Sequence, residues 1–358
     1  MGIRETALEE EEMLNLTKPQ RLNRGDKVAT VSLSWGGAGD ANLIWRYKQG
    51  KKRLQEQFGL NVVEMPNTLK GTAFVYQNPQ KRAEDLMAAF SDPSIKAIFT
   101  CIGGDDSIRM LPYIDFDVIR NNPKILVGYS DTTITHFICL KANLSSFYGP
   151  SILAEFAENI KIFDYTAYWL GKAVFDPSPI GIIPIAKEWT GEIIEWDESN
   201  VLIEKVLSKN NEYEFLQGKG VVSGHLIGGC IEVMEMMKGT SLWPSKEVFD
   251  GAILFFETSE DVPVPFFLEY WLRNYGMLGI LQKAKGIIFG KPYQGKYYDE
   301  YKLSIERIVM KELGLTDLPI IYNMTFGHNQ PMTCLPYGAL AEIDCENKTF
   351  SILEAAVL

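Results

Sequence analysis

The chain has 358 residues, of which 46% are hydrophobic and 23% are charged, a balance typical of a soluble globular protein with a sizeable core. Because this length exceeds that of one ordinary core, we expect two domains. The formal net charge of -11 at pH 7 repels nucleic acid backbones and disfavours nucleic acid as a partner. No stretch is apolar enough to cross a bilayer, and the acidic residues 1–13 lack the apolar centre of a secretory signal. We therefore expect a cytoplasmic protein without a membrane partner.

The cysteines are scattered along the chain and form no C-x-x-C pair. Such an odd set is typical of a reducing compartment and argues against structural zinc, so we expect no metal. The five cysteines are Cys101, Cys139, Cys230, Cys334 and Cys345.

The first half of the chain alternates strand-like and helical segments. Strands are predicted at residues 27–34, 61–66, 97–102 and 125–129. Helices are predicted from a cap at Asp40 to residue 58, from a cap at Asn78 with Pro79 at its first position, and over residues 131–142. Repeated β-α-β units with nearly continuous apolar strands predict a parallel sheet that is covered on both faces.

A helix over residues 165–175 closes this half. The proline-containing segment that follows indicates a linker, so we expect domains at 1–175 and 191–358 with the linker at 176–190. The second half is predicted to be mixed α/β. Its expected strands are 201–207, 221–226, 252–256, 286–289 and 319–323, and its expected helices are 266–275 and 301–313.

The segment ILVGYSDTT places Ser130 at a turn between a buried strand and a helix. A nucleophile elbow uses this arrangement, because the sharp turn pushes the hydroxyl into the crevice at the carboxyl end of the sheet. The backbone N–H of Asp131 would then be one oxyanion donor. The alternative is that Ser130 only caps the helix, since serine is a preferred cap and G-x-S-x-T is not the full elbow pattern.

The segment CIGGDDS also follows a buried strand. Gly103 and Gly104 allow the backbone to approach a ligand closely, and a glycine N–H here could complete an oxyanion hole with Asp131. Two other interpretations stay open. One is an ordinary tight turn, and the other is a nucleotide-binding kinase that uses the turn Gly103-Gly104-Asp105, in which the glycines cradle a phosphate.

A nucleophilic serine needs a base and a group that orients the base. Of the three histidines, His136 lies on the helix after Ser130 and is expected to pack. Position favours His328, in a loop after a strand, over His225. Glu257 is the first charged residue after the strand at 252–256. Further acidic residues nearby are typical of a solvated face: Glu260, Asp261 and Glu269.

Taken in order, several segments resemble the LD-carboxypeptidase family of serine peptidases, which includes the microcin C self-immunity proteins. They are GGDDSIRMLPYIDFDVI, VGYSD, GHLIGG, LFFETSED, GHNQP and LPYGALAEID. The resemblance implies that Ser130 is the nucleophile, His328 the general base and Glu257 the orienting acid. It also implies that the oxyanion donors are the backbone N–H groups of Gly104 and Asp131.

The resemblance further implies a flavodoxin-like α/β N-terminal domain and a smaller mixed α/β C-terminal domain with the active site between them. It implies no metal, no cofactor and a homodimer. One family branch trims cell-wall tetrapeptides, and the other cleaves a peptidyl or aminoacyl nucleotide with tryptophans that stack on the base.

Trp189 and Trp196, in KEWTGEIIEWDE, resemble the tryptophan-bearing loop of the second branch and favour it. We expect substrate contacts from Gly103, Trp189, Trp196 and the position of Cys230. The family commonly has asparagine at that last position, and a thiol cannot make the same hydrogen bonds. A murein tetrapeptide carboxypeptidase is the alternative within the family, with core packing the alternative for each tryptophan.

Overall fold

The computed structural model describes residues 14–358, so the acidic start at 1–13 lies outside the described residues. A six-stranded sheet has the order β14-β5-β4-β3-β1-β2, and its strands are parallel from β2 to β5. The order 2-1-3-4-5 is that of the flavodoxin-like fold, which confirms the predicted fold class. The strands are β1 (Lys27–Val31), β2 (Asn61–Glu64), β3 (Ile95–Thr100), β4 (Ile125–Gly128), β5 (Phe147–Tyr148) and β14 (Leu335–Pro336).

The second sheet has eight strands in the order β6-β16-β15-β10-β11-β12-β13-β9. It is mixed, because β10 to β13 are parallel whereas the strands beyond them on both sides are antiparallel. Its strands are β6 (Gly181–Ile182), β9 (Glu214–Gln217), β10 (Val221–Cys230), β11 (Ile253–Glu257), β12 (Gly286–Gly290), β13 (Ile320–Met324), β15 (Leu340–Asp344) and β16 (Thr349–Ile352). A separate pair is formed by β7 (Glu188–Trp189) and β8 (Ser208–Lys209).

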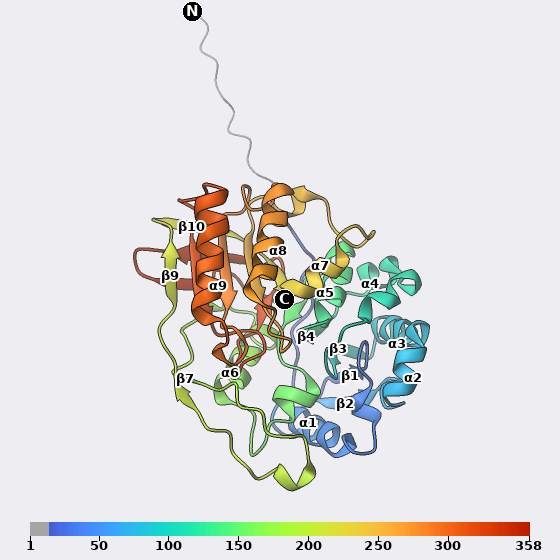
Figure 1. The fold of residues 1–358 in the computed structure, drawn as a ribbon. Coiled ribbons are helices and arrows are strands. Elements are labelled where there is room, and N and C mark those ends of the chain that lie inside the picture. Colours follow the sequence, from blue (N-terminus) through green and yellow to red (C-terminus); the bar gives the residue numbers. More distant parts are fainter. Residues whose placement is uncertain (1–13) are drawn as a thin grey trace, which may run out of the picture.

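Helices follow most of the parallel strands and pack beside the sheets, α1 to α5 around the first and α7 to α9 around the second (Figure 1). They are α1 (Ile44–Glu56), α2 (Thr72–Gln77), α3 (Pro79–Ser91), α4 (Phe116–Asn121), α5 (Thr132–Lys141), α6 (Asp164–Val174), α7 (Ile231–Met237), α8 (Pro265–Met277) and α9 (Tyr298–Ile305). None of the helices between residues 14 and 358 is both long and apolar enough to span a membrane.

Two local predictions are wrong. Residues 201–207 form a turn and an irregular segment instead of a strand, and most of their apolar side chains stay exposed, as in Leu202 (81%) and Val206 (71%). β-Branched residues favour a strand only where a partner strand can pair with them. Asp40 does not cap α1, which begins at Ile44; its carboxylate accepts hydrogen bonds from the backbone N–H and hydroxyl of Thr72.

Two short strands lie outside the predicted domain whose sheet they join. β14 comes from the C-terminal half but pairs with β5 of the first sheet, and β6, in the predicted linker, pairs with β16 of the second. Both sheets therefore contain residues from beyond the predicted boundaries, and the division at 1–175, 176–190 and 191–358 stays a prediction.

Candidate active site

Ser130 lies two residues after the end of β4 and two residues before the start of α5. Its φ of 61° lies in the left-handed region, which a non-glycine residue occupies only when the surrounding structure holds it there. The turn is fixed by Thr133, whose backbone N–H and hydroxyl both donate to Ser130 O, at 2.9 and 2.7 Å. The Ser130 side chain does not cap the helix but contacts a histidine ring from the other sheet.

Three predicted side chains meet here, one from the first sheet and two from the second. His328 Nε2 lies 3.0 Å from Ser130 Oγ, and His328 Nδ1 lies 2.7 Å from Glu257 Oε2. Glu257 is the last residue of β11 and is 2% exposed, while His328 lies in the loop after β13. The parallel strands β11 and β13 end at the same edge of the sheet, which brings the acid and the histidine together.

A second carboxylate reaches the same histidine. Glu260 Oε2 lies 2.9 Å from His328 Nε2, the nitrogen that also contacts Ser130. Burial disfavours a charged imidazole, but Glu257 and Glu260 outweigh it and raise the pKa of His328 well above its usual value. The hydrogen bond with His328 in turn lowers the pKa of Glu260 to about 2.

The glycine turn after β3 faces the serine. A Cβ atom on Gly103 would lie 2.8 Å from Ser130 Cβ, 2.9 Å from Ser130 Oγ and 3.2 Å from the backbone N of Asp131. Gly104 has a φ of 145°, and a Cβ atom there would meet Ser34 Oγ at 2.3 Å. The absence of a side chain at Gly103 therefore leaves the serine hydroxyl and the N–H of Asp131 uncrowded, and the absence of one at Gly104 lets this turn lie against Ser34.

The Asp131 side chain holds this turn in place through Ser107. Its Oδ2 accepts a hydrogen bond from the backbone N–H of Ser107 at 2.9 Å, and the Ser107 hydroxyl donates to Asp131 O at 3.0 Å. Asp131 is fully buried, and this burial raises the pKa of its carboxyl. The side chain thus ties the glycine turn to the start of α5, while its backbone N–H stays toward Gly103.

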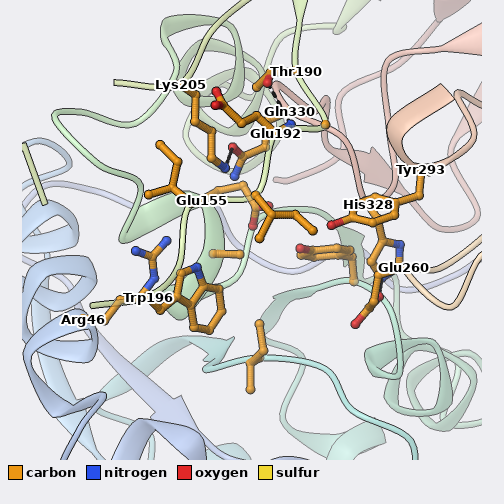
Figure 2. Close-up of a pocket in the computed structure, with 16 residues that line it drawn as sticks. Arg46, Glu155, Thr190, Glu192, Trp196, Lys205, Glu260, Tyr293, His328 and Gln330 are labelled. Atoms are coloured by element: carbon orange, nitrogen blue, oxygen red, sulfur yellow. Dashed lines mark hydrogen bonds and ion pairs between the residues drawn. The ribbon is translucent and has the colours of Figure 1, made fainter. Parts of the chain in front are cut away.

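A pocket opens next to His328 and extends between the sheets to Trp196 (Figure 2). The Arg46 guanidinium lies over the Trp196 ring at 4.3 Å, and the Trp35 ring stacks on Trp196 with centroids 6.4 Å apart. Arg46 is 2% exposed and donates to Leu153 O at 2.6 Å. Burial lowers the pKa of Arg46 to about 10.

The segment that carries Trp196 is tied to the loop that carries His328. Thr190 and Gln330 exchange two backbone hydrogen bonds, at 2.7 and 3.0 Å. Lys205 donates to the Gln330 side chain and pairs with the nearly buried Glu158, both at 2.8 Å. The wall of the pocket and the histidine therefore form one connected unit.

Other predicted site residues lie elsewhere. A second hollow at Ser130 is lined by Ser130, Gly103 and Trp35. Trp189 lines neither this hollow nor the pocket at Trp196, and its ring packs under Lys291 Nζ at 4.3 Å. Cys230 is fully buried, and its thiol contacts Glu232, so it reaches neither lining. His136 and His225 also stay apart from Ser130, since their rings bond to Ser146 and Gly128 O, and to Val248 O.

Sequence reasoning missed three contributors. Arg46 and Trp35 come from the first domain and meet Trp196 only in the fold. Tyr148 contacts both Ser130 and Glu257 through its hydroxyl. The sequence near each of these residues gives no sign of its contacts. For Tyr148, the only available signal is that the segment SSFYGP follows the helix after Ser130, where a short strand can be expected. Within residues 14–358, no group of three or more His, Cys, Asp or Glu side chains could hold a metal ion.

Comparisons with known proteins show the family and the fold of the chain. A family model of the LD-carboxypeptidase N-terminal domain matches residues 28–149, and one of the LD-carboxypeptidase C-terminal domain matches residues 223–343. The Microcin C7 self-immunity protein MccF of Escherichia coli is 31% identical over 86% of this chain and 88% of its own. A Bacillus subtilis protein named Probable murein peptide carboxypeptidase is 26% identical over 95% of both chains.

A solved structure is similar over nearly the whole chain. It is an MccF-like protein from Streptococcus pneumoniae in complex with AMP, with a TM-score of 0.85 and 30% identity, and the match covers 92% of this chain and 98% of that one.

Proposed function

The chain belongs to the LD-carboxypeptidase family, and from this premise we propose that it is a serine peptidase that cleaves an amide bond in a peptidyl or aminoacyl nucleotide. One observation carries the proposal: the contacts run from Glu257 through His328 to Ser130 beside a pocket that contains Trp196.

In the proposed reaction, neutral His328 accepts the Ser130 proton at Nε2 as Oγ attacks the substrate carbonyl. Glu257 accepts the Nδ1 hydrogen bond and so fixes the orientation of the ring. The backbone N–H groups of Gly104 and Asp131 stabilise the negative oxygen of the tetrahedral intermediate. His328 then protonates the leaving amine, and water releases the acyl group from Ser130.

The nucleotide part of the proposal is supported by the chemistry of the pocket. Trp196 offers a flat aromatic surface, and stacking of a base on such a ring is worth about 1–3 kcal/mol. The buried cation of Arg46 beside it would favour a substrate with a negatively charged linkage. The relatives agree in kind, since one is named for microcin self-immunity and another is in complex with AMP.

No matching observation favours the kinase alternative. The glycine turn that would cradle a phosphate is pressed against Ser130, and the Gly103 Cβ position lies 2.9 Å from the serine hydroxyl. The murein alternative is supported by the name of a Bacillus subtilis relative. A homodimer, which the family resemblance implies, stays a prediction.

The test is a product assay by mass spectrometry with no added metal or ATP. The purified protein is incubated with aspartyl sulfamoyl adenosine and, separately, with a murein tetrapeptide. We expect the first to be cleaved to aspartate and sulfamoyl adenosine, and Ser130→Ala to abolish this cleavage. Cleavage of the tetrapeptide alone would assign the protein to the cell-wall branch. A product that forms only in a parallel sample with added magnesium and ATP would favour a kinase.

A further inference from the structure

Tyr148 forms hydrogen bonds to both Ser130 and Glu257, the two residues that contact opposite sides of the His328 ring. Its hydroxyl oxygen accepts a hydrogen bond from the backbone N–H of Ser130 at 3.2 Å, and its O–H donates to Glu257 Oε1. The other carboxylate oxygen contacts His328, whose second nitrogen contacts Ser130 Oγ. The four residues therefore form a closed ring of hydrogen bonds that uses both oxygens of the carboxylate.

We propose that Tyr148 is a positioning residue that holds the nucleophile backbone and the orienting carboxylate in fixed relation through its hydroxyl group. The inference rests on the proposed function, because it assumes that Ser130 and Glu257 do the work. Tyr148 lines neither the pocket at Trp196 nor the hollow at Ser130. It therefore acts through these two residues and not on the substrate.

The surroundings of Tyr148 suit this role. It is the last residue of β5, opposite Gly128 of β4, and its side chain is fully buried. The ring packs against Phe255 of β11 at 5.5 Å and against His136 of α5 at 5.7 Å, so the second sheet and the helix after Ser130 both hold it. Burial and the neighbouring Glu257 raise the pKa of the phenol well above its usual value, which keeps the proton that it donates.

Each hydrogen bond has a separate consequence. Ser130 is held at a φ of 61°, and the bond from its N–H gives that buried donor an acceptor which it would otherwise lack. The bond to Glu257 Oε1 draws part of the negative charge away from the oxygen that faces His328. If this donor is lost, more charge stays on Oε2 and the imidazolium is more strongly favoured.

The test is Tyr148→Phe, with Tyr337→Phe as the matched control. Tyr337 is also fully buried and packs on the same two neighbours, His136 at 4.7 Å and Phe255 at 5.2 Å, but its hydroxyl donates to Gly228 O. Both changes remove one buried phenol oxygen. Only the first removes a partner of the nucleophile and the acid.

Two readouts are needed. The first is the rate at which a fluorophosphonate labels Ser130, which should fall about 10- to 100-fold in Tyr148→Phe, the value of a hydrogen bond to a charged group. The second is NMR titration of His328, one of only three histidines, whose pKa should rise in Tyr148→Phe. Tyr337→Phe should change neither the labelling rate nor the pKa of His328.

If Tyr148→Phe does not fold, 3-fluorotyrosine at position 148 provides a second variant. It keeps both hydrogen bonds and makes the phenol a stronger donor to Glu257, so it should lower the pKa of His328.

Two results would overturn the proposal. One is wild-type labelling with an unchanged His328 titration in Tyr148→Phe. The other is an equal loss in Tyr148→Phe and Tyr337→Phe, which would mean that the hydroxyl serves packing alone. The titration needs no substrate, so it decides the role of Tyr148 even if no amide is cleaved, a result that would count against the proposed function.

Discussion

A methyl group at Gly103 should obstruct the site without changing its chemistry. Gly103 faces Ser130, and the added Cβ of Gly103→Ala would lie 2.8 Å from Ser130 Cβ and 2.9 Å from Oγ, where ordinary contacts begin at 3.4 Å. An ordinary contact would require Ser130 Cβ to move by about 0.6 Å (3.4 − 2.8 Å), and this would disturb a serine whose Oγ lies 3.0 Å from His328 Nε2. The φ of Gly103 is not positive, so the change tests the lack of space and not backbone strain.

The expected loss follows from two effects. A displacement of about 1 Å in a catalytic group can cost about 100-fold in rate. The methyl would also stand 3.2 Å from the backbone N of Asp131, and loss of one oxyanion donor costs about 100- to 1,000-fold in kcat. We therefore expect kcat to fall at least about 100-fold, while overpacking lowers the free energy of unfolding by about 1–3 kcal/mol.

The assay compares kcat, KM and the thermal unfolding midpoint of Gly103→Ala with those of Gly171→Ala. Gly171 lies in α6 with no atom within 4 Å of its Cβ position, so alanine there should preserve kcat and stabilise the helix by about 0.5–1 kcal/mol. Wild-type kcat in a well-folded Gly103→Ala protein would refute the claim that Gly103 must lack a side chain for Ser130 and the N–H of Asp131 to act.

Two further substitutions test the charge and the shape of the pocket. Activity needs neutral His328, so kcat/KM rises as the pH increases through the pKa of His328. Glu260→Gln removes a carboxylate that raises this pKa. The substitution should therefore move the acid limb of the kcat/KM profile to lower pH. The same shift in Asp261→Asn, whose side chain is an exposed neighbour, would show a general charge effect instead. Trp196→Ala should lower kcat/KM about 5- to 150-fold on a nucleotide substrate but little on a murein peptide. Trp189→Ala should affect both substrates alike, and a base-selective loss there would contradict the assignment of the pocket to Trp196.

The strands that end at the site could be predicted because their sequences are locally simple. Buried apolar runs precede Ser130, Gly103 and Glu257, and parallel strands place their carboxyl ends at one edge. The choice between His225 and His328 as the base could not be made from strand patterns alone. Position after a strand favoured His328, and the resemblance to a known family assigned it the role of base.

Contacts between distant segments could not be predicted in this way. Tyr148 belongs to a strand of two residues, which is too short for a periodic pattern. Trp189 and Trp196 share one polar segment, yet the first pairs in β7 near Lys291 and the second meets Arg46 from α1. The apolar run at 201–207 looks like a strand but has no partner strand. It is held instead by Lys205, whose ammonium group donates to the side chains of Glu158 and Gln330.

The central claim is that Ser130 forms a covalent acyl intermediate, and acid-quench peptide mass mapping tests it most directly. The protein is mixed with aspartyl sulfamoyl adenosine, quenched within the first turnover and digested. We predict an added aspartyl group on the peptide that contains Ser130, and neither adduct nor product in Ser130→Ala. Product formation at the wild-type rate by Ser130→Ala, with no adduct in the native protein, would contradict the account.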